Sequence, residues 1–172
     1  MKEITFISGF IGILLTYSSI ILPAYSQVKS DNTTNTIVNT NGTNFNIING
    51  IQKGNNLFHS FDRFSIPTGG SASFNNSTDI VNIINRVTGG NISNIDGLIK
   101  ANGNANLFLI NPAGIVFGEN ASLNIGGSFI GSTAQSILFE DGFNYSAIDS
   151  YQTPLLTVSV PLGLQMGNNP GD

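Results

Sequence analysis

Short apolar runs, each interrupted by turn-forming residues, occupy the chain from Phe45 onward. The runs are about three to six residues long, a length that is normal for β-strands and too short for globular helices. Asn, Gly and Pro fill the gaps, as they do in tight turns. This pattern predicts an all-β chain of many short strands. The runs fall at Phe45/Ile47, 58–66, 80–84, 92/95, 98–99, 107–110, 115–117, 123/125, 129–130 and 137–139.

Charged residues make up only 9% of the 172 residues, whereas about a quarter is usual in a globular domain. Asparagine takes their place, with 24 Asn beside 20 Gly. The net charge of −4, with few and scattered Lys and Arg, excludes a basic nucleic-acid-binding domain. The absence of cysteine from the sequence excludes a disulfide scaffold and a thiolate metal site. A chain with 40% hydrophobic residues and so little charge does not have a disordered composition, and its length fits one domain.

A repeat is visible in the middle of the chain. Thr68–Ser73 and Thr88–Ser93 share the pattern T-G-G-x-x-S at a spacing of 20 residues, and Gly126-Gly127 repeats the double glycine. Periods of 20–50 residues are typical of stacked architectures, and about 20 residues suits one coil of a β-solenoid. Stacked asparagines can then form side-chain amide ladders between coils. A single helical turn is conceivable over 133–140, but the β-branched and aromatic residues there argue against more.

The segment 1–26 differs from the rest of the chain. Lys2 is followed by a mostly apolar run over 4–22, then by Pro23 and by Ala24-Tyr25-Ser26. This is the pattern of a secretory signal peptide, with cleavage expected between Ser26 and Gln27. The alternative is an uncleaved membrane anchor, since a run of about 19 residues is long enough to cross a bilayer.

Few residues offer catalytic chemistry. His59 is the only histidine, and its setting predicts a satisfied, partly exposed histidine on a strand. Asp62, Asp79 and Asp96 recur at equal intervals close to one predicted coil, so that a column of acids on one face is conceivable. One His without Cys argues against a zinc site, and we expect neither a metal nor a cofactor.

Asn111-Pro112-Ala113-Gly114 is the clearest local motif. Asn first, Pro second and Gly fourth is the signature of a type I turn between the apolar runs 107–110 and 115–117. Its spacing favours a tight corner over a recognition loop.

Several longer segments carry a family likeness. They are Leu57-Phe58-His59-Ser60-Phe61, Phe64-Ser65-Ile66-Pro67, Ile83-Ile84-Asn85-Arg86-Val87-Thr88-Gly89-Gly90, Ile95-Asp96-Gly97-Leu98-Ile99, the stretch from Leu107 to Gly118, and 126–134. Together they resemble the N-terminal domain of filamentous haemagglutinins, also called the two-partner secretion (TPS) domain, and most of all its cyanobacterial members. The likeness covers about 43–170 and includes Asn169-Pro170-Gly171 near the end of the chain.

The resemblance implies an all-β, right-handed parallel β-helix with short capping or extra-helical strands. It implies export through the inner membrane and recognition in the periplasm by an outer-membrane β-barrel transporter with periplasmic recognition domains. The domain would then help to template a longer β-helical passenger, such as an adhesin, that is secreted or held at the cell surface and binds host or cell-surface glycans. The turn Asn111, Pro112, Ala113, Gly114 aligns with a family motif, Asn-Pro-Asn-Gly, that is implicated in secretion; here Ala113 replaces the second Asn.

We therefore expect a signal peptide over 1–26, a polar N-terminal arm or cap over 27–44 and a TPS β-helix domain over 45–172, incomplete at its C-terminal end and marginally stable alone. The expected function is secretion and targeting, not catalysis. Two alternatives remain open at this point: a β-helix enzyme acting on polysaccharides through Asp62, Asp79 and Asp96, and a self-standing glycan-binding adhesive module.

Overall fold

The computed structural model describes residues 27–149 and 156–167. All the regular secondary structure in these ranges consists of β-strands. The predicted signal segment and Asn169-Pro170-Gly171 lie outside the described residues. Among the described residues there is no helix with the length and apolarity needed to cross a membrane. The strands are β1 (Val28–Ser30), β2 (Thr36–Asn41), β3 (Asn44–Asn49), β4 (Ile51–Lys53), β5 (Asn56–Phe64), β6 (Ser71–Phe74), β7 (Asn82–Val87), β8 (Ser93–Ile95), β9 (Leu98–Ala101), β10 (Asn106–Ile110), β11 (Ile115–Phe117), β12 (Ser122–Asn124), β13 (Phe129–Ser132), β14 (Ser136–Phe139), β15 (Asn144–Ser146) and β16 (Pro161–Gln165).

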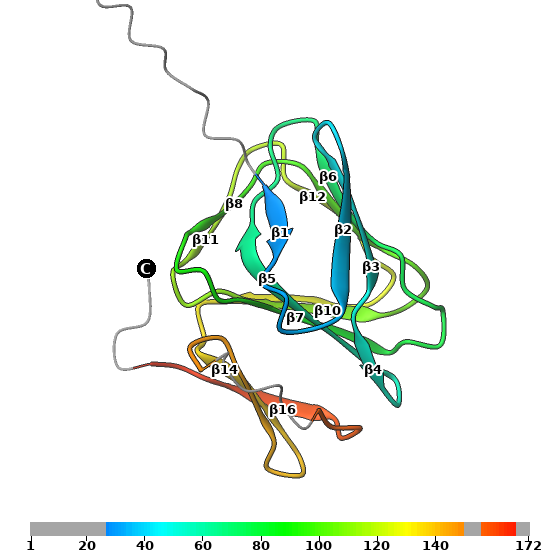
Figure 1. The fold of residues 1–172 in the computed structure, drawn as a ribbon, viewed down its shortest axis with the longest axis vertical. Helices are drawn as coiled ribbons and strands as arrows, with labels where there is room; N and C mark the ends of the chain where they lie inside the picture. Colours follow the sequence, from blue (N-terminus) through cyan, green and yellow to red (C-terminus); the bar gives the residue numbers. More distant parts are fainter. Residues whose placement is uncertain (1–26, 150–155, 168–172) are drawn as a thin grey trace, which may run out of the picture.

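Most of these strands stack in parallel and form three walls (Figure 1). Wall A contains β5, β7, β10 and β13, wall B contains β3, β6, β9 and β12, and wall C contains β8 and β11. The chain passes from wall A to wall C to wall B and back, so each circuit is one coil. At the N-terminal end, β1 pairs antiparallel with β5 and β2 pairs antiparallel with β3. The predicted all-β parallel β-helix with extra capping strands is confirmed.

Each coil contains more residues than the spacing of the two T-G-G segments predicted. The number of residues also varies from coil to coil. The Asn82 side chain bonds to Asn56, 26 residues earlier, and the Asn106 side chain bonds to Asn82, 24 residues earlier. The next step, from Ser128 back to Asn106, is 22 residues. Because the corners differ in length while the strands stay in register, no single period runs through the sequence.

The two T-G-G segments lie at different corners. Thr68–Gly70 leads into β6 of wall B, whereas Thr88–Gly90 connects β7 of wall A to β8 of wall C. Both contain a glycine with positive φ, +71° at Gly69 and +70° at Gly90. The positive φ falls on the first glycine of one segment and on the second glycine of the other, so the shared letters reflect neither stacking nor one common turn. The glycine that does stack on Gly70 is Gly97, where a Cβ would collide with the Gly70 carbonyl oxygen.

The apolar residues form two cores separated by wall A. The first fills the coil interior and contains most of the phenylalanines of β3 to β6. The second lies between the outer face of wall A and a three-stranded antiparallel sheet in the order β15-β14-β16. All six residues of β7 are buried because wall A is covered on both faces. In the segment 133–140, β14 forms a strand and not a helical turn.

Amide ladders tie successive coils together, as the asparagine content predicted. Asn82 Nδ2 donates to Asn56 Oδ1 at 2.9 Å, and Asn106 Nδ2 donates to Asn82 Oδ1 at 3.1 Å. On another corner, Asn102 N donates to Asn76 Oδ1 at 2.9 Å, and Asn102 Nδ2 donates to Asn75 Oδ1 at 3.1 Å. Asn82 both donates and accepts along its stack, so its buried amide is satisfied without charge.

Candidate recognition site

The segment Asn111–Gly114 forms the corner between β10 of wall A and β11 of wall C. Gly114 N donates to the Asn111 carbonyl at 3.0 Å and closes the turn. Ala113 N donates to Asn111 Oδ1 at 3.0 Å, which is the local bond that an Asn at the first position of a turn provides. Gly114 has a φ of +122°, which a residue with a Cβ rarely adopts. The conformation of the corner therefore accounts for the Asn at its first position and the Gly at its fourth.

Asn111 is wholly buried, and its polar groups connect three successive coils. Its Nδ2 donates to the Asn91 carbonyl and to Ser93 Oγ, both at 2.9 Å, in the preceding coil. Its backbone N–H donates to the Ser132 carbonyl at 3.0 Å in the following coil. A partner cannot touch this side chain, so any recognition at the corner falls to its neighbours.

The exposed part of the corner is small and apolar. Pro112 and Ala113 are half-buried and line a shallow cavity of about 250 Å³, together with Thr88 and Ile148. Ile148 is 59% exposed, and Ile92, which lies beside Gly114, is 51% exposed. This apolar rim around the turn is the surface of the motif that another protein can reach; we call it the corner rim (Ile92, Pro112, Ala113 and Ile148).

A buried arginine lies on β7, where it is the register partner of Ile110, the residue before Asn111. Arg86 of β7 is 1% exposed, and its Nε donates to Ser60 Oγ at 2.8 Å. Its Nη2 donates to Thr33 Oγ1 at 3.0 Å, and its Nη1 donates to the Ser146 carbonyl at 2.6 Å. The guanidinium carbon lies 4.4 Å from the ring centroid of Tyr145, which makes a cation–π contact.

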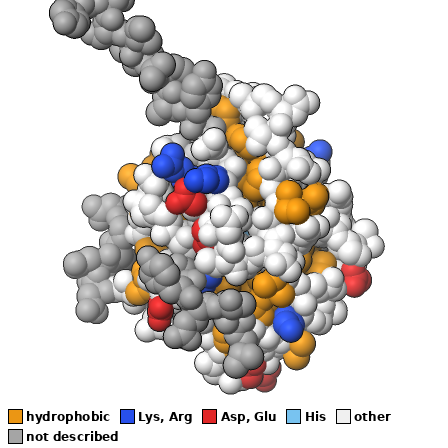
Figure 2. Space-filling model, in the orientation of Figure 1, with side chains coloured by type: hydrophobic (Ala, Val, Ile, Leu, Met, Phe, Trp, Pro, Cys, Tyr) orange, Lys and Arg blue, Asp and Glu red, His pale blue; other side chains and the backbone are white. Residues whose placement is uncertain are grey.

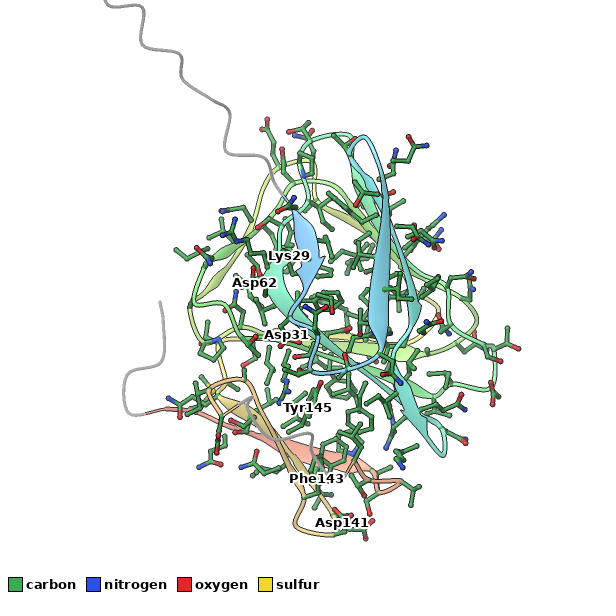
Figure 3. All side chains as sticks on the ribbon, in the orientation of Figure 1. Lys29, Asp31, Asp62, Asp141, Phe143 and Tyr145 are labelled. Carbon is green, nitrogen blue, oxygen red and sulfur yellow. The ribbon has the colours of Figure 1, made fainter. Side chains whose placement is uncertain are left out.

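Asp31 supplies the compensating negative charge through hydroxyl groups. Its Oδ2 accepts from Ser60 Oγ at 2.5 Å and from Thr88 Oγ1 at 2.8 Å, while its Oδ1 accepts from Thr33 N at 2.9 Å. Burial alone would raise the pKa of Asp31, but the bonds from Ser60, Thr33 and Thr88 outweigh it and hold that pKa below its ordinary value. Figure 3 shows Asp31 on the N-terminal segment and Tyr145 at the seam between wall A and the sheet of β14.

Sequence reasoning missed this Arg86 network. The available signal was an arginine inside the run Ile83-Ile84-Asn85-Arg86-Val87, where a charge is unexpected in a buried strand. Its partners come from β5, from the segment before β2 and from β15, and no local pattern in the sequence relates those three segments.

His59 was expected to be partly exposed, and that expectation is wrong. It lies on β5 but is 1% exposed, packed 5.5 Å from the ring of Phe74, because its side chain points into the coil. Its Nδ1 lies 2.9 Å from Thr36 Oγ1, so the predicted satisfied histidine is confirmed. Burial lowers the pKa of His59 to about 3.

The three acids of the enzyme hypothesis do not converge. Asp62 lies on wall A and pairs with Lys29 and Arg63, each at 3.6 Å. Asp79 lies in the turn before β7, and Asp96 lies in the corner between walls C and B, where it accepts from Thr68 Oγ1. The interval between successive acids is shorter than any coil, so the three carboxylates fall on different parts of the circuit.

The described residues include few charged side chains, and on the face drawn in Figure 2 these stand apart from one another except for one group of basic and acidic side chains. Within residues 27–149 and 156–167, no group of three or more His, Cys, Asp or Glu could hold a metal ion. The most distinctive feature of this surface is the corner rim, which surrounds the turn built on the buried Asn111.

Comparison with known proteins adds three likenesses. A family model described as "TPS secretion domain" matches residues 26–172. A heme/hemopexin-binding protein of Haemophilus influenzae is 40% identical over 58 residues, which are 34% of this chain and 6% of that protein. The crystal structure of the HMW1 secretion domain from Haemophilus influenzae is 29% identical, with a TM-score of 0.46, over 63% of this chain and 26% of that one. The chain thus corresponds to a small part of each relative.

Proposed function

This chain belongs to the family of TPS secretion domains. We therefore propose that an outer-membrane β-barrel transporter recognises it through periplasmic domains. Domains of this family are modules for secretion and targeting rather than enzymes. The observation that carries the proposal is the family match over 26–172, which spans every described strand of the solenoid. The dispersed positions of Asp62, Asp79 and Asp96 add nothing in favour of the polysaccharide enzyme.

In this proposal the chain divides into three parts. Residues 1–26 direct export, 27–44 cap the N-terminal end of the solenoid, and 45–172 form the targeting domain. The antiparallel pairing of β1 with β5 and of β2 with β3 supports the cap, because both strands lie beside the first coil. The complete protein would present an adhesin-like passenger at the cell surface or release it, and its glycan target would belong to that passenger.

We assign the Asn111–Gly114 motif a divided role. Asn111 and Gly114 build the corner, since the first is buried and the second has positive φ. Pro112 and Ala113, with the rest of the corner rim, would contact the transporter. An apolar, uncharged rim suits recognition by packing and backbone pairing, which need no charged partner.

A capture experiment tests this role. Residues 27–172 are passed over the immobilised periplasmic domains of the transporter, as the unmodified domain and as Ala113→Arg. The arginine places a charge on the half-buried rim, so we expect at least about a tenfold loss of affinity, or about 1.4 kcal/mol, with an unchanged melting temperature.

The matched control is Asn46→Arg, which adds the same charge at an exposed position of β3 in wall B. It should bind like the unmodified domain. Equal binding of Ala113→Arg and Asn46→Arg would contradict the role of the corner rim. Failure of the unmodified domain to bind, together with normal export after deletion of residues 27–118, would contradict transporter recognition itself.

A further inference from the structure

The sheet outside wall A contacts three successive coils of the solenoid through β5, β7 and β10. We call residues 134–147 and 156–165, which contain β14, β15 and β16, the strap. In Figure 1 the strap lies outside the three walls and against wall A only. Its contacts with the solenoid are of three kinds.

The first contact is apolar. Phe58, Ile84 and Ile110, one from each of β5, β7 and β10, form a stripe on the outer face of wall A, and each is 0% exposed. The strap covers this stripe, with Tyr145 at 5.1 Å and Phe139 at 5.8 Å from the ring of Phe58. Without the strap, the stripe would be a contiguous apolar surface crossing three coils.

The second contact is polar and centres on Arg86. The strap supplies the Ser146 carbonyl and the Tyr145 ring to a guanidinium that already binds Ser60 and Thr33. The Tyr145 hydroxyl also donates to the His59 carbonyl at 2.9 Å. These bonds join the strap to the N-terminal segment as well as to two strands of wall A.

The third contact closes an amide ladder. Asn56 Nδ2 donates to the Ser159 carbonyl at 2.7 Å and to the Thr157 carbonyl at 3.3 Å, at sequence separations of 103 and 101 residues. Asn56 is the first amide of the ladder that continues through Asn82 to Asn106. A late segment of the chain thus completes the hydrogen bonds of an early coil.

From these contacts we propose that the strap is a folding lock: the solenoid becomes stable only when the strap docks. A chain that ends at Ser132 contains all three walls but leaves the apolar stripe uncovered and the ladder unclosed. Strap and walls therefore form one cooperative unit, and folding waits for residues 134–165. This inference concerns folding and does not depend on transporter recognition, so either can fail alone.

Native-state hydrogen exchange on residues 27–172, which contain every described strand, tests the lock. The comparison is between amides of β14 in the strap and amides of β6 and β9 in wall B, whose strands take part in none of the three contacts described above. Their protection should agree within about tenfold, because all open together in global unfolding. Exchange of β14 more than about a hundredfold faster, with β6 and β9 still protected, would overturn the proposal.

Two variants of neighbouring residues on β14 provide a second test of the folding lock. Ile137→Asp places a charge at a 0% exposed position facing wall A, whereas Leu138→Asp changes the next residue, which is 36% exposed. We expect Ile137→Asp to lose protection in β6 and β9 as well as in the strap, and Leu138→Asp to match the parent. If Ile137→Asp kept a cooperative transition with wall B protected and the strap open, the lock would be disproved. If Ile137→Asp cannot be purified folded, the exchange pattern of the unmodified domain decides alone.

Discussion

His59 shows how one buried residue can set the acid stability of a protein with few charged residues. Ser60 N donates to Thr34 Oγ1 at 3.2 Å, Thr34 and Thr36 share a hydroxyl bond of 2.7 Å, and Thr36 Oγ1 lies 2.9 Å from His59 Nδ1. The chain of bonds satisfies a neutral imidazole, and burial with aromatic neighbours leaves no charge partner for an imidazolium. The folded protein therefore holds His59 unprotonated.

This predicts a specific pH window. The folded pKa of His59 is lowered to about 3 from an ordinary value of 6.5, so its contribution to stability is fully present above 6.5. As the pH falls from 6.5 toward 3, the free energy of unfolding should decrease by about 1.4 kcal/mol per pH unit, because only the unfolded chain takes up the proton. Urea titrations at pH 7.5, 5.5 and 4.5 measure this decrease.

The control for that prediction is His59→Gln, which keeps an acceptor and cannot be protonated. Its unfolding free energy should be nearly constant from pH 7.5 to 4.5. The aspartates whose pKa is lowered in the folded protein lose their contribution only as the pH falls below their ordinary value of 3.8; they are Asp31, Asp79, Asp96 and Asp141. An unmodified protein whose stability stayed flat across this window would refute the assignment.

At the scale of the strand, amide ladders are the main side-chain interaction that joins neighbouring coils. In wall A the ladder joins the first residues of β5, β7 and β10: Asn82 bonds to Asn56, and Asn106 bonds to Asn82. The last member, Asn106 Oδ1, accepts from Ser128 N at 3.0 Å and so continues the ladder into the backbone before β13. A ladder holds neighbouring strands in register, since a slip of one residue would break every bond.

A central ladder position should therefore be costly to change. Asn82→Leu keeps the side-chain size but leaves Asn56 Oδ1 and Asn106 Nδ2 without their bonds in a buried setting. We expect a loss of about 2–4 kcal/mol in the free energy of unfolding. Asn46→Leu, at an exposed position of β3, is the matched control and should lie within about 0.5 kcal/mol of the parent. Similar effects of both changes, measured by urea unfolding, would contradict the role of the ladder.

At the scale of the whole molecule, the stability of the fold depends more on where the charged side chains lie than on how many there are. The two ion pairs found among the described residues share the carboxylate of Asp62, and its partner Lys29 has a side chain that is 61% exposed. Arg86, by contrast, is buried and depends on hydroxyl groups that Asp31 orients. Solvent and salt screen the exposed ion pairs of Asp62, but they do not screen the buried Arg86 and its hydroxyl partners.

Two isosteric changes separate these arrangements. Asp62→Asn should lower the free energy of unfolding by less than about 1 kcal/mol, since exposed ion pairs contribute little. Asp31→Asn should cost about 2–4 kcal/mol, because it removes the charge that faces Arg86 and replaces an acceptor of Ser60 and Thr88 with a donor. Thermal unfolding at low and high salt measures both. A larger effect at Asp62 than at Asp31 would contradict the assignment.

Much of the fold follows from local pattern. The lengths of the apolar runs predicted β-strands, the Asn and Gly content predicted turns and amide ladders, and the order of residue types in Asn111–Gly114 predicted a tight corner. Each of these depends on a few neighbouring residues: alternate side chains point to opposite faces of a strand, and a turn constrains four positions. The family likeness, read from longer strings, gave the targeting role that the family match supports.

The stacking of coils was decided only by the tertiary structure. The sequence suggested a shorter coil from two T-G-G segments and a column of acids from their equal spacing. Coils of 22–27 residues place the members of each set on different parts of the circuit. It also gave no sign that the strap buries the outer face of wall A and encloses Arg86 and Tyr145. The physical reason is that strand and turn preferences act over a few residues, whereas register, two-sided burial and the pairing of a buried charge depend on segments up to about a hundred residues apart.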